Sequence, residues 1–365
     1  MKYYVIAGEA SGDLHASNLV KQIKILDPKA DFRCWGGDLL QQTGATLVKH
    51  YKEMSYMGFT EVLLHLPEIL KNIQFCKKDI LKYKPDAVIL VDYPGFNLRI
   101  AGFAKQHGFR VFYYISPQVW AWKQNRVEKM KKVVDKMLVI LPFEKAFYKK
   151  FDWDVEFVGH PLLDAIGGER DEGRGTEDRD EKPLIALLPG SRKQEISRIL
   201  PVMLQIVPRF PNYRFMIAGA PSVPPSFYDE IIRGKDVKVV FGNTYSLLRQ
   251  SGAALVTSGT ATLETALIGV PQVVCYNAGV ISYSIAKWLI KVKYISLVNL
   301  IAAQELVKEL IQDNLNPENL VRELTIILKD ENERARILKG YEAIKQQLGG
   351  TGASARAAAV IAGEL

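Results

Sequence analysis

Cysteine and metal-binding motifs are scarce in this sequence of 365 residues. Its three cysteines are scattered and none belongs to a C-x-x-C pair, so neither a disulfide framework nor a zinc ribbon is expected. The five histidines show no H-x-x-x-H spacing, and a D-x-D string at Asp178 and Asp180 lies in a charged segment, where solvation explains it. We therefore predict no bound metal and no cofactor.

Long apolar runs are also missing. No stretch approaches the roughly 20 uncharged apolar residues that a membrane-spanning helix needs. The opening "MKYYVIAGEA" has no signal-peptide cleavage pattern, because its apolar run leads straight into a predicted strand and turn. The sequence thus favours a cytoplasmic protein.

Negative charge is in the minority, with 40 acidic against 48 basic residues and a net charge of +8. This balance favours an anionic partner. Composition alone leaves open whether that partner is nucleic acid, a phosphorylated substrate or an acidic membrane surface.

The usual nucleotide-binding motifs are absent as well. The chain contains no P-loop G-x-x-x-x-G-K-[ST], no G-x-S-x-G elbow and no G-x-G-x-x-G. The turn after the first predicted strand reads "AGEASGD" (7–13), with the spacing G-x-x-x-G and with acids at Glu9 and Asp13, where a pyrophosphate favours none. A Rossmann-type dehydrogenase is therefore not expected.

What is present is a regular alternation of apolar β-type runs and helical patterns, which restarts at Leu184. Such alternation predicts an α/β protein in which each half is a parallel sheet with helices on both faces. We predict a first Rossmann-like domain over 1–166, a polar, glycine-rich linker or loop over 167–183 and a second Rossmann-like domain over 184–335. Residues 336–365 are predicted to be helical, and ligands are expected in a cleft between the two domains.

Two turns in the second half have the composition of anion sites. In "LLPGSR", Gly190, Ser191 and Arg192 follow a buried strand and open a helix, where backbone N–H groups and a guanidinium favour a diphosphate. A simple helix cap with a solvent-facing arginine is the alternative.

The second of these turns is "VTSGTATLE". It combines small hydroxyls and close backbone approach with Glu264, one helical turn after Thr260. This arrangement suits a phosphate and a ribose, with the carboxylate accepting from the sugar hydroxyls. The alternative is that Glu264 is an ordinary acid in the first helical turn.

In the first half, Asp92 ends the strand of "VILVDYPGFN" and is a candidate general base, or else a cap for the next helix. After the neighbouring strand, "ISPQVWAWK" supplies Ser116, Gln118 and Trp120. An aromatic side chain there suits stacking on a sugar or the lining of an acyl pocket, and a plain core role is the alternative.

The segment 54–84 carries more apolar residues than one buried helix face requires, together with five lysines. Met57, Phe59 and Leu63 belong to this excess. Apolar surface rimmed by lysine suits the headgroup zone of an anionic bilayer. A wide core face or a dimer contact would explain it too.

Taken together, the motifs resemble the lipid-A-disaccharide synthase family over nearly the whole chain. The matching strings are "AGEASGD", "MGFTEVL", "VDYPGFN", "SPQVWAWK", "LPFEKAFY", "FVGHPLLD", "LLPGSR", "SGTATLE" and "LVNLIAAQELVKEL". The resemblance implies a glycosyltransferase fold of the B-type. It also implies metal-free, inverting transfer of 2,3-diacylglucosamine from UDP to the 6-hydroxyl of 2,3-diacylglucosamine 1-phosphate.

The resemblance further implies roles for individual residues. Asp92 matches an essential aspartate and becomes the candidate base, with Glu9 as the second candidate, while Arg192 is expected on the donor diphosphate. The expected donor contacts are Gly190, Ser191, Arg192, Ser258, Gly259, Thr260, Glu264, Tyr276, Asn299, Gln304 and Glu305. The expected acceptor contacts are Gly8, Glu9, Ser11, Asp13, Ser116, Gln118 and Trp120, with helix capping as the alternative for Ser11 and Asp13.

The resemblance also bears on partners. It implies a protein at the cytoplasmic face of the inner membrane, with no nucleic-acid partner, whose C-terminal helices cross back to the first domain or are exchanged in a homodimer. A UDP-N-acetylglucosamine 2-epimerase of the same fold and a non-catalytic nucleotide-sugar-binding module are the alternatives. The epimerase acts on a small unacylated sugar, so it leaves the apolar, basic segment 54–84 without a reason.

Overall fold

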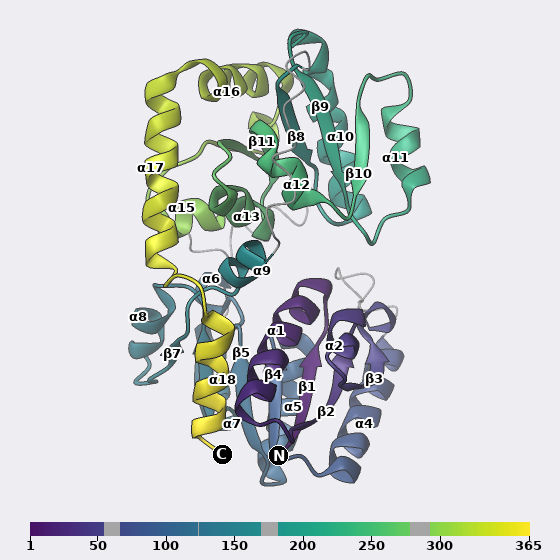
Figure 1. Ribbon diagram of the computed structural model, residues 1–365, viewed down its shortest axis with the longest axis vertical. Coiled ribbons are helices and arrows are strands. Elements are labelled where there is room, and N and C mark those ends of the chain that lie inside the picture. Colours follow the sequence, from purple (N-terminus) through teal and green to yellow (C-terminus); the bar gives the residue numbers. More distant parts are fainter. Residues whose placement is uncertain (55–65, 123, 169–181, 278–292) are drawn as a thin grey trace. The chain divides into compact units, whose positions relative to one another are not determined.

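The computed structural model describes residues 1–54, 66–122, 124–168, 182–277 and 293–365 (Figure 1). The chain divides into two compact units. Unit 1 comprises Met1–Ala165 and Leu348–Leu365, and unit 2 comprises Ile166–Gln347.

Unit 1 is built on a parallel sheet of seven strands in the order β3-β2-β1-β4-β5-β6-β7. The strands are β1 (Lys2–Ala7), β2 (Asp31–Gly36), β3 (Thr46–His50), β4 (Ala87–Val91), β5 (Arg110–Tyr114), β6 (Lys136–Val139) and β7 (Glu156–Phe157). All five residues of central strand β4 are buried, as the run "AVILV" predicts for a strand covered on both faces.

The helices of unit 1 connect these strands. They are α1 (Ala10–Leu26), α2 (Asp38–Gln42), α4 (Leu66–Tyr83), α5 (Pro94–Gln106), α6 (Val119–Trp122), α7 (Val127–Val133), α8 (Glu144–Lys149) and α18 (Ala353–Gly363), with short 3-10 turns at Tyr51–Glu53 and Gln124–Arg126. Helix α9 (Leu162–Gly168) contains the boundary between the units.

Unit 2 has a parallel sheet of six strands in the order β10-β9-β8-β11-β12-β13. The strands are β8 (Leu184–Leu188), β9 (Arg214–Gly219), β10 (Lys238–Phe241), β11 (Ser251–Thr257), β12 (Gln272–Tyr276) and β13 (Glu309–Ile311). The helices are α10 (Lys193–Gln205), α11 (Pro225–Ile232), α12 (Thr244–Arg249), α13 (Thr260–Ile268), α15 (Leu297–Ala302), α16 (Pro317–Lys329) and α17 (Glu331–Gln347), with 3-10 turns at Val207–Arg209 and Gln312–Asn314.

The C-terminal segment divides differently from the predicted boundary at 336. Helix α17 belongs to unit 2, where Tyr341 is buried and its hydroxyl accepts from Gln272 Nε2 at 3.2 Å. Its Gly340 lies so close to Leu306 that a Cβ would come within 2.3 Å of that side chain. Helix α17 packs against α13, α15 and α16 of unit 2, and only the last 18 residues, Leu348–Leu365, join unit 1.

Helix α18 packs along α1 within unit 1 (Figure 1). Ala353, Ala357 and Ala358 are buried on its inner face, and such small side chains permit close approach of two helices. The carboxylate of Asp164 accepts from the backbone N–H of Ser354 at 2.8 Å and of Gly352, so it caps the start of α18. The return of the chain to its first unit is therefore fixed by both packing and a cap.

Candidate active site

The turn after β4 places Asp92 at the carboxyl end of a central strand. Asp92 and Tyr93 both have left-handed backbones, with φ of 44° and 47°, which is strained for residues other than glycine and is typical of functional sites. The Asp92 N–H donates to the carbonyl of Tyr114 at 3.1 Å, and the Asp92 carbonyl accepts from the Tyr113 hydroxyl at 2.6 Å and from Asn97 Nδ2 at 2.8 Å. The backbone of this turn is thus held from three sides.

Glu9 and Asp92 follow paired strand ends. In the sheet, Ala7 of β1 lies opposite Val91 of β4, so the segments after them emerge side by side. Burial, and to a smaller extent the charge of Glu9, raise the pKa of Asp92 to about 7, although a hydrogen bond from the Tyr93 backbone opposes the shift. A carboxyl group with a pKa near neutrality is suited to accept a proton from a hydroxyl group.

Gly8 has a packing role at this turn. A Cβ on Gly8 would lie 2.3 Å from the aromatic ring of Tyr93, so only glycine permits the ring to rest against the strand end. The Tyr93 hydroxyl in turn donates to the carbonyl of Met54 at 2.9 Å. Gly8 therefore fixes the shape of the turn that carries Asp92.

Asp13 is committed to the fold. It is 2% exposed, and its carboxylate accepts from the backbone N–H groups of Gly37 at 2.7 Å, Leu39 at 3.0 Å and Leu40 at 3.2 Å. Those groups open helix α2, so Asp13 caps a helix other than its own. Ser11, the other residue with a capping alternative, lies exposed in the first turn of α1.

Asp13→Ala is expected to lower the free energy of unfolding by about 2 kcal/mol, because three backbone N–H groups lose a charged acceptor. Denaturant titration measures this difference. Asp38→Ala is the matched control, since Asp38 is a mostly exposed acid in the first turn of α2. Unchanged stability of Asp13→Ala together with a higher KM for an acceptor would show instead that Asp13 is a ligand contact.

The segment after β5 is largely buried. Ser116 is 4% exposed and donates to the carbonyl of Pro117 at 3.0 Å, and its hydroxyl also contacts that of Tyr148. Trp120 is 8% exposed and packs edge-on against Phe143, with ring centroids 4.9 Å apart. Trp120 therefore has the surroundings of a core residue, which was the alternative to stacking on a sugar. The Gln118 side chain, by contrast, is exposed.

Glu144 is an acid that the sequence analysis did not single out. It follows β6, the neighbour of β5, and is 1% exposed, with its carboxylate accepting from the N–H groups of Ile140 at 3.1 Å and Leu141 at 2.8 Å. Burial raises its pKa to about 7, and these two backbone bonds oppose the shift. The pattern that singled out Asp92 does not extend to Glu144, because Asp92 directly follows β4 whereas Glu144 opens α8, five residues beyond the end of β6.

In unit 2, three neighbouring strands end in three of the predicted donor segments. The strands β8, β11 and β12 are adjacent in the sheet, and they lead into residues 190–192, residues 258–260 and Tyr276. Because the strands are parallel, these segments share one edge of the sheet. The structure thus brings most of the predicted donor residues together.

The turn after β8 has the geometry of an anion site and holds an internal anion. Gly190 has a φ of 120°, and Arg192 is the N-cap of α10. The carboxylate of Glu195 accepts from the Ser191 N–H at 3.1 Å and lies 3.3 Å from the Arg192 guanidinium. The two groups predicted to bind a diphosphate are those that this carboxylate contacts.

The turn after β11 leads into α13 through Gly259. The Ser258 hydroxyl donates to the carbonyl of Ile295 at 2.9 Å, and the Ser258 N–H donates to the carbonyl of Cys275 at 3.1 Å. Glu264 accepts from the Tyr245 hydroxyl at 2.9 Å. Burial raises the pKa of Glu264, and the bond from Tyr245 opposes the shift.

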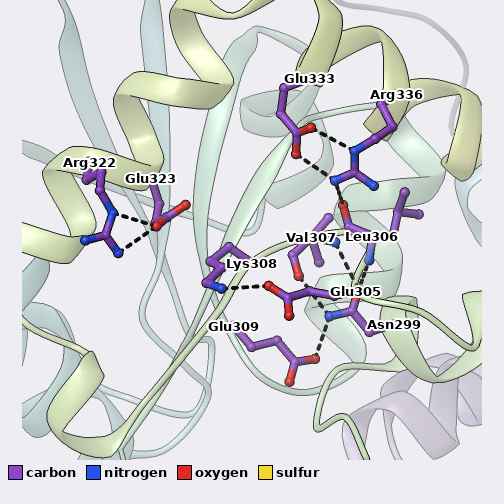
Figure 2. A network of polar contacts seen from close by, with 10 residues as sticks. All are labelled: Asn299, Glu305, Leu306, Val307, Lys308, Glu309, Arg322, Glu323, Glu333 and Arg336. Carbon is purple, nitrogen blue, oxygen red and sulfur yellow. Dashed lines mark hydrogen bonds and ion pairs between the residues drawn. The ribbon is translucent and has the colours of Figure 1, made fainter.

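Asn299 is fully buried and its amide is used by the protein itself (Figure 2). Its Oδ1 accepts from the N–H groups of Leu306 at 2.8 Å and Val307 at 3.0 Å. Its Nδ2 donates to the carbonyl of Val307 at 2.8 Å and to Glu309 at 2.9 Å. With both donors and both acceptor positions of its amide occupied, the Asn299 side chain offers no further hydrogen-bonding position to a ligand.

Gln304 and Glu305 are not brought to the same edge as the other donor residues. They precede β13, which runs parallel to β12, so they lie towards the amino end of that strand. Both side chains are exposed, and Glu305 pairs with Lys308 at 2.8 Å (Figure 2).

The predicted apolar residues Met57, Phe59 and Leu63 lie outside the described residues. In the described part of the chain, no helix is long and apolar enough to cross a membrane. Among the same residues, no cluster of three or more histidine, cysteine, aspartate or glutamate side chains could hold a metal ion.

Comparison with known protein sequences matches the chain to one family. The family model described as lipid-A-disaccharide synthetase matches residues 3–362. A lipid-A-disaccharide synthase of Syntrophus aciditrophicus is 42% identical over 97% of this chain and 95% of its own length. Another, of Geobacter metallireducens, is 38% identical over 98% of this chain and 95% of its own length.

Solved structures support the fold. A UDP-GlcNAc 2-epimerase of Neisseria meningitidis bound to UDP-GlcNAc superposes with a TM-score of 0.70 at 13% identity, covering 100% of this chain and 99% of its own. The calicheamicin glycosyltransferase CalG4 superposes with a TM-score of 0.62 at 18% identity, covering 99% of this chain and 97% of its own. At such low identity these likenesses establish the architecture alone.

Proposed function

The chain belongs to the lipid-A-disaccharide synthase family, and on this premise we propose how its two units share the reaction. The chain transfers 2,3-diacylglucosamine from UDP to the 6-hydroxyl of 2,3-diacylglucosamine 1-phosphate. Unit 2 receives the UDP-sugar and unit 1 the acceptor. The observation that carries this assignment is the carboxyl group of Asp92, whose pKa is raised to about 7 at the carboxyl end of β4.

The reaction proceeds by one displacement. Asp92 accepts the proton of the acceptor 6-hydroxyl, and the oxygen attacks the anomeric carbon from the face opposite UDP, so the configuration inverts. The bond to the diphosphate breaks and its electron pair leaves with UDP. Arg192 and the N–H groups at the starts of α10 and α13 stabilise the charge that develops on the leaving group.

Glu9 has a supporting role in this scheme. Its charge raises the pKa of Asp92, and it lies at the N-cap of α1 beside the same strand ends. Glu9 therefore tunes the base, and it remains the second candidate for accepting the proton.

Glu264 accepts from the ribose hydroxyls of UDP in exchange for its bond to Tyr245.

The decisive assay combines purified protein with UDP-diacylglucosamine and diacylglucosamine 1-phosphate in detergent. We expect UDP and the disaccharide phosphate to appear together, and only when the acylated acceptor is present. Formation of N-acetylmannosamine from UDP-N-acetylglucosamine would instead establish the epimerase, and UDP binding without turnover of either substrate would indicate a binding module.

The outer face of α4 supports contact with an anionic membrane surface at the cytoplasmic side. Ile73, Cys76 and Ile80 are buried on its inner face, whereas Leu70 and Phe75 are 50% and 48% exposed. The exposed side chains line a shallow hollow with Pro67, Lys71, Gln74 and Lys78. Apolar side chains between lysines bind at the headgroup boundary, close to where acylated substrates reside.

Replacing both Leu70 and Phe75 with serine is expected to weaken binding to anionic vesicles by about tenfold or more, because two apolar side chains no longer leave water. Vesicle co-sedimentation measures the change. Ile25→Ser is the matched control, since Ile25 is 69% exposed at the end of a different helix, α1. Unchanged sedimentation of the double variant would remove α4 as the membrane contact.

A homodimer with exchanged C-terminal segments stays a prediction. Within one chain, the cap from Asp164 and the packing along α1 already give α18 a complete site. Exchange would preserve these same contacts between two copies. Size-exclusion chromatography with light scattering distinguishes the two forms.

A further inference from the structure

The carboxylate of Glu309, the first residue of β13, accepts hydrogen bonds from residues at the start of α15. Its Oε1 accepts from the Ser296 N–H at 3.0 Å, from the Ser296 hydroxyl at 2.7 Å and from Asn299 Nδ2 at 2.9 Å. Its Oε2 accepts from the Ile295 N–H at 3.1 Å. One half-buried carboxylate therefore satisfies four donors, including two backbone groups that precede the helix.

The segment that Glu309 holds is the one that Ser258 contacts. The Ile295 N–H donates to Glu309, and the Ile295 carbonyl accepts a hydrogen bond from the Ser258 hydroxyl at 2.9 Å. Ser258 lies at the carboxyl end of β11 and opens the turn into α13. A short chain of hydrogen bonds thus runs from β13, through one peptide segment, to the edge of the sheet where β8, β11 and β12 end.

Asn299 completes this arrangement from the other side (Figure 2). It donates to Glu309 and holds the backbone of Leu306 and Val307 just before β13. The start of α15 and the start of β13 are therefore locked together by one carboxylate and one amide. Loss of the Glu309 charge leaves the Ile295 and Ser296 N–H groups without an acceptor in a mostly buried place.

We propose that Glu309 is a positioning residue for the UDP-sugar, acting through residues 295–296 to fix the Ser258 turn. The inference rests on the proposed function, which places the donor at that turn. Glu309 touches no substrate. It sets the position of the Ser258 hydroxyl and of the N–H groups that follow it, and donor binding depends on that position.

The test compares Glu309→Gln and Glu309→Ala with Glu333→Gln. Glu333 is the matched control, because its carboxylate also holds a partner of the same unit, Arg336, at 2.6 and 2.7 Å, but on α17 (Figure 2). We expect both Glu309 variants to raise the KM for the UDP-sugar and the Kd for UDP by about tenfold. The acceptor KM should change less than about twofold, and the Glu333 variant should match the wild type in all three.

Glutamine separates positioning from packing, because it fills the same space but turns an NH₂ group towards N–H donors. A Glu309→Gln protein with wild-type affinity for UDP overturns the proposal, as does an equal rise in both KM values. In a Ser258→Ala background, Glu309→Gln should have little further effect on donor KM, and full additivity would contradict the route through Ser258.

Should neither Glu309 variant fold, Ser258→Ala carries the test alone, and an unchanged donor KM overturns the proposal. The outcome is separable from that of the proposed function. Calorimetric titration with UDP reports on the donor turn whether or not the wild type makes a disaccharide, whereas an inactive wild type that binds UDP refutes the transferase assignment and leaves this inference standing.

Discussion

Asp92→Asn is expected to lower kcat by about a thousandfold while the Kd for UDP stays close to that of the wild type. Asparagine keeps the shape of the turn but cannot accept the proton of the acceptor hydroxyl. The backbone bonds from Tyr113 and Asn97 do not involve the side chain, so the turn should persist. Single-turnover assays and calorimetric titration with UDP measure the two quantities.

The pH dependence of the wild type gives an independent check of the same base. As the proposed base, Asp92 acts in its deprotonated form, and its pKa is raised to about 7, so kcat/KM should rise with pH up to about 7 and level off above it. Glu9→Gln removes a charge that raises this pKa, so the midpoint should move to lower pH. A pH-independent rate between pH 5 and 8 would contradict the assignment.

As the pH rises, the stability of the fold should fall while the transferase activity rises. A carboxyl group whose folded pKa lies above its unfolded value stabilises the fold at low pH, and this stability is lost as the pH rises through about 7. Asp92→Asn removes the ionisation, so the variant should melt a few degrees higher than the wild type at pH 8 and at nearly the same temperature at pH 4. Substantial transferase activity in this variant would remove Asp92 as the base.

Arg192→Ala is expected to lower kcat/KM for the UDP-sugar by about 100-fold or more, because it removes the cation that we propose stabilises the leaving diphosphate. Arg192→Lys should recover part of this loss, since it keeps the charge but not the fork of N–H donors. Arg198→Ala is the matched control, as Arg198 is an exposed arginine on the same helix.

The Glu195 carboxylate needs its own control. It lies 3.3 Å from the Arg192 guanidinium, so Arg192→Ala also leaves an acid without this partner beside the predicted phosphate site. If repulsion from Glu195 caused the loss, the double variant with Glu195→Gln would regain wild-type activity. We expect the double variant to stay impaired, and full recovery would assign the effect to Glu195.

Much of this molecule could be predicted from local patterns. The fully buried runs of β4 and β8 carry their strand signal in consecutive residues, and the stripe of Ile196, Ile199 and Met203 marks the buried face of α10. The strand-to-helix turns that carry Asp92, Arg192 and Ser258 were found by the same reasoning. Hydrophobic period and turn chemistry act within about ten residues, so the sequence alone contains them.

The sequence by itself therefore determined the two-sheet architecture, the family and the turns at the strand ends. Only the tertiary structure decided which polar groups remain available there, because their partners come from distant segments. Asp13 caps a helix that begins 25 residues later, and the Asn299 amide hydrogen-bonds to Glu309 and to the backbone before β13. The raised pKa of Asp92 likewise depends on burial and on the pairing of β1 with β4, which no local pattern encodes.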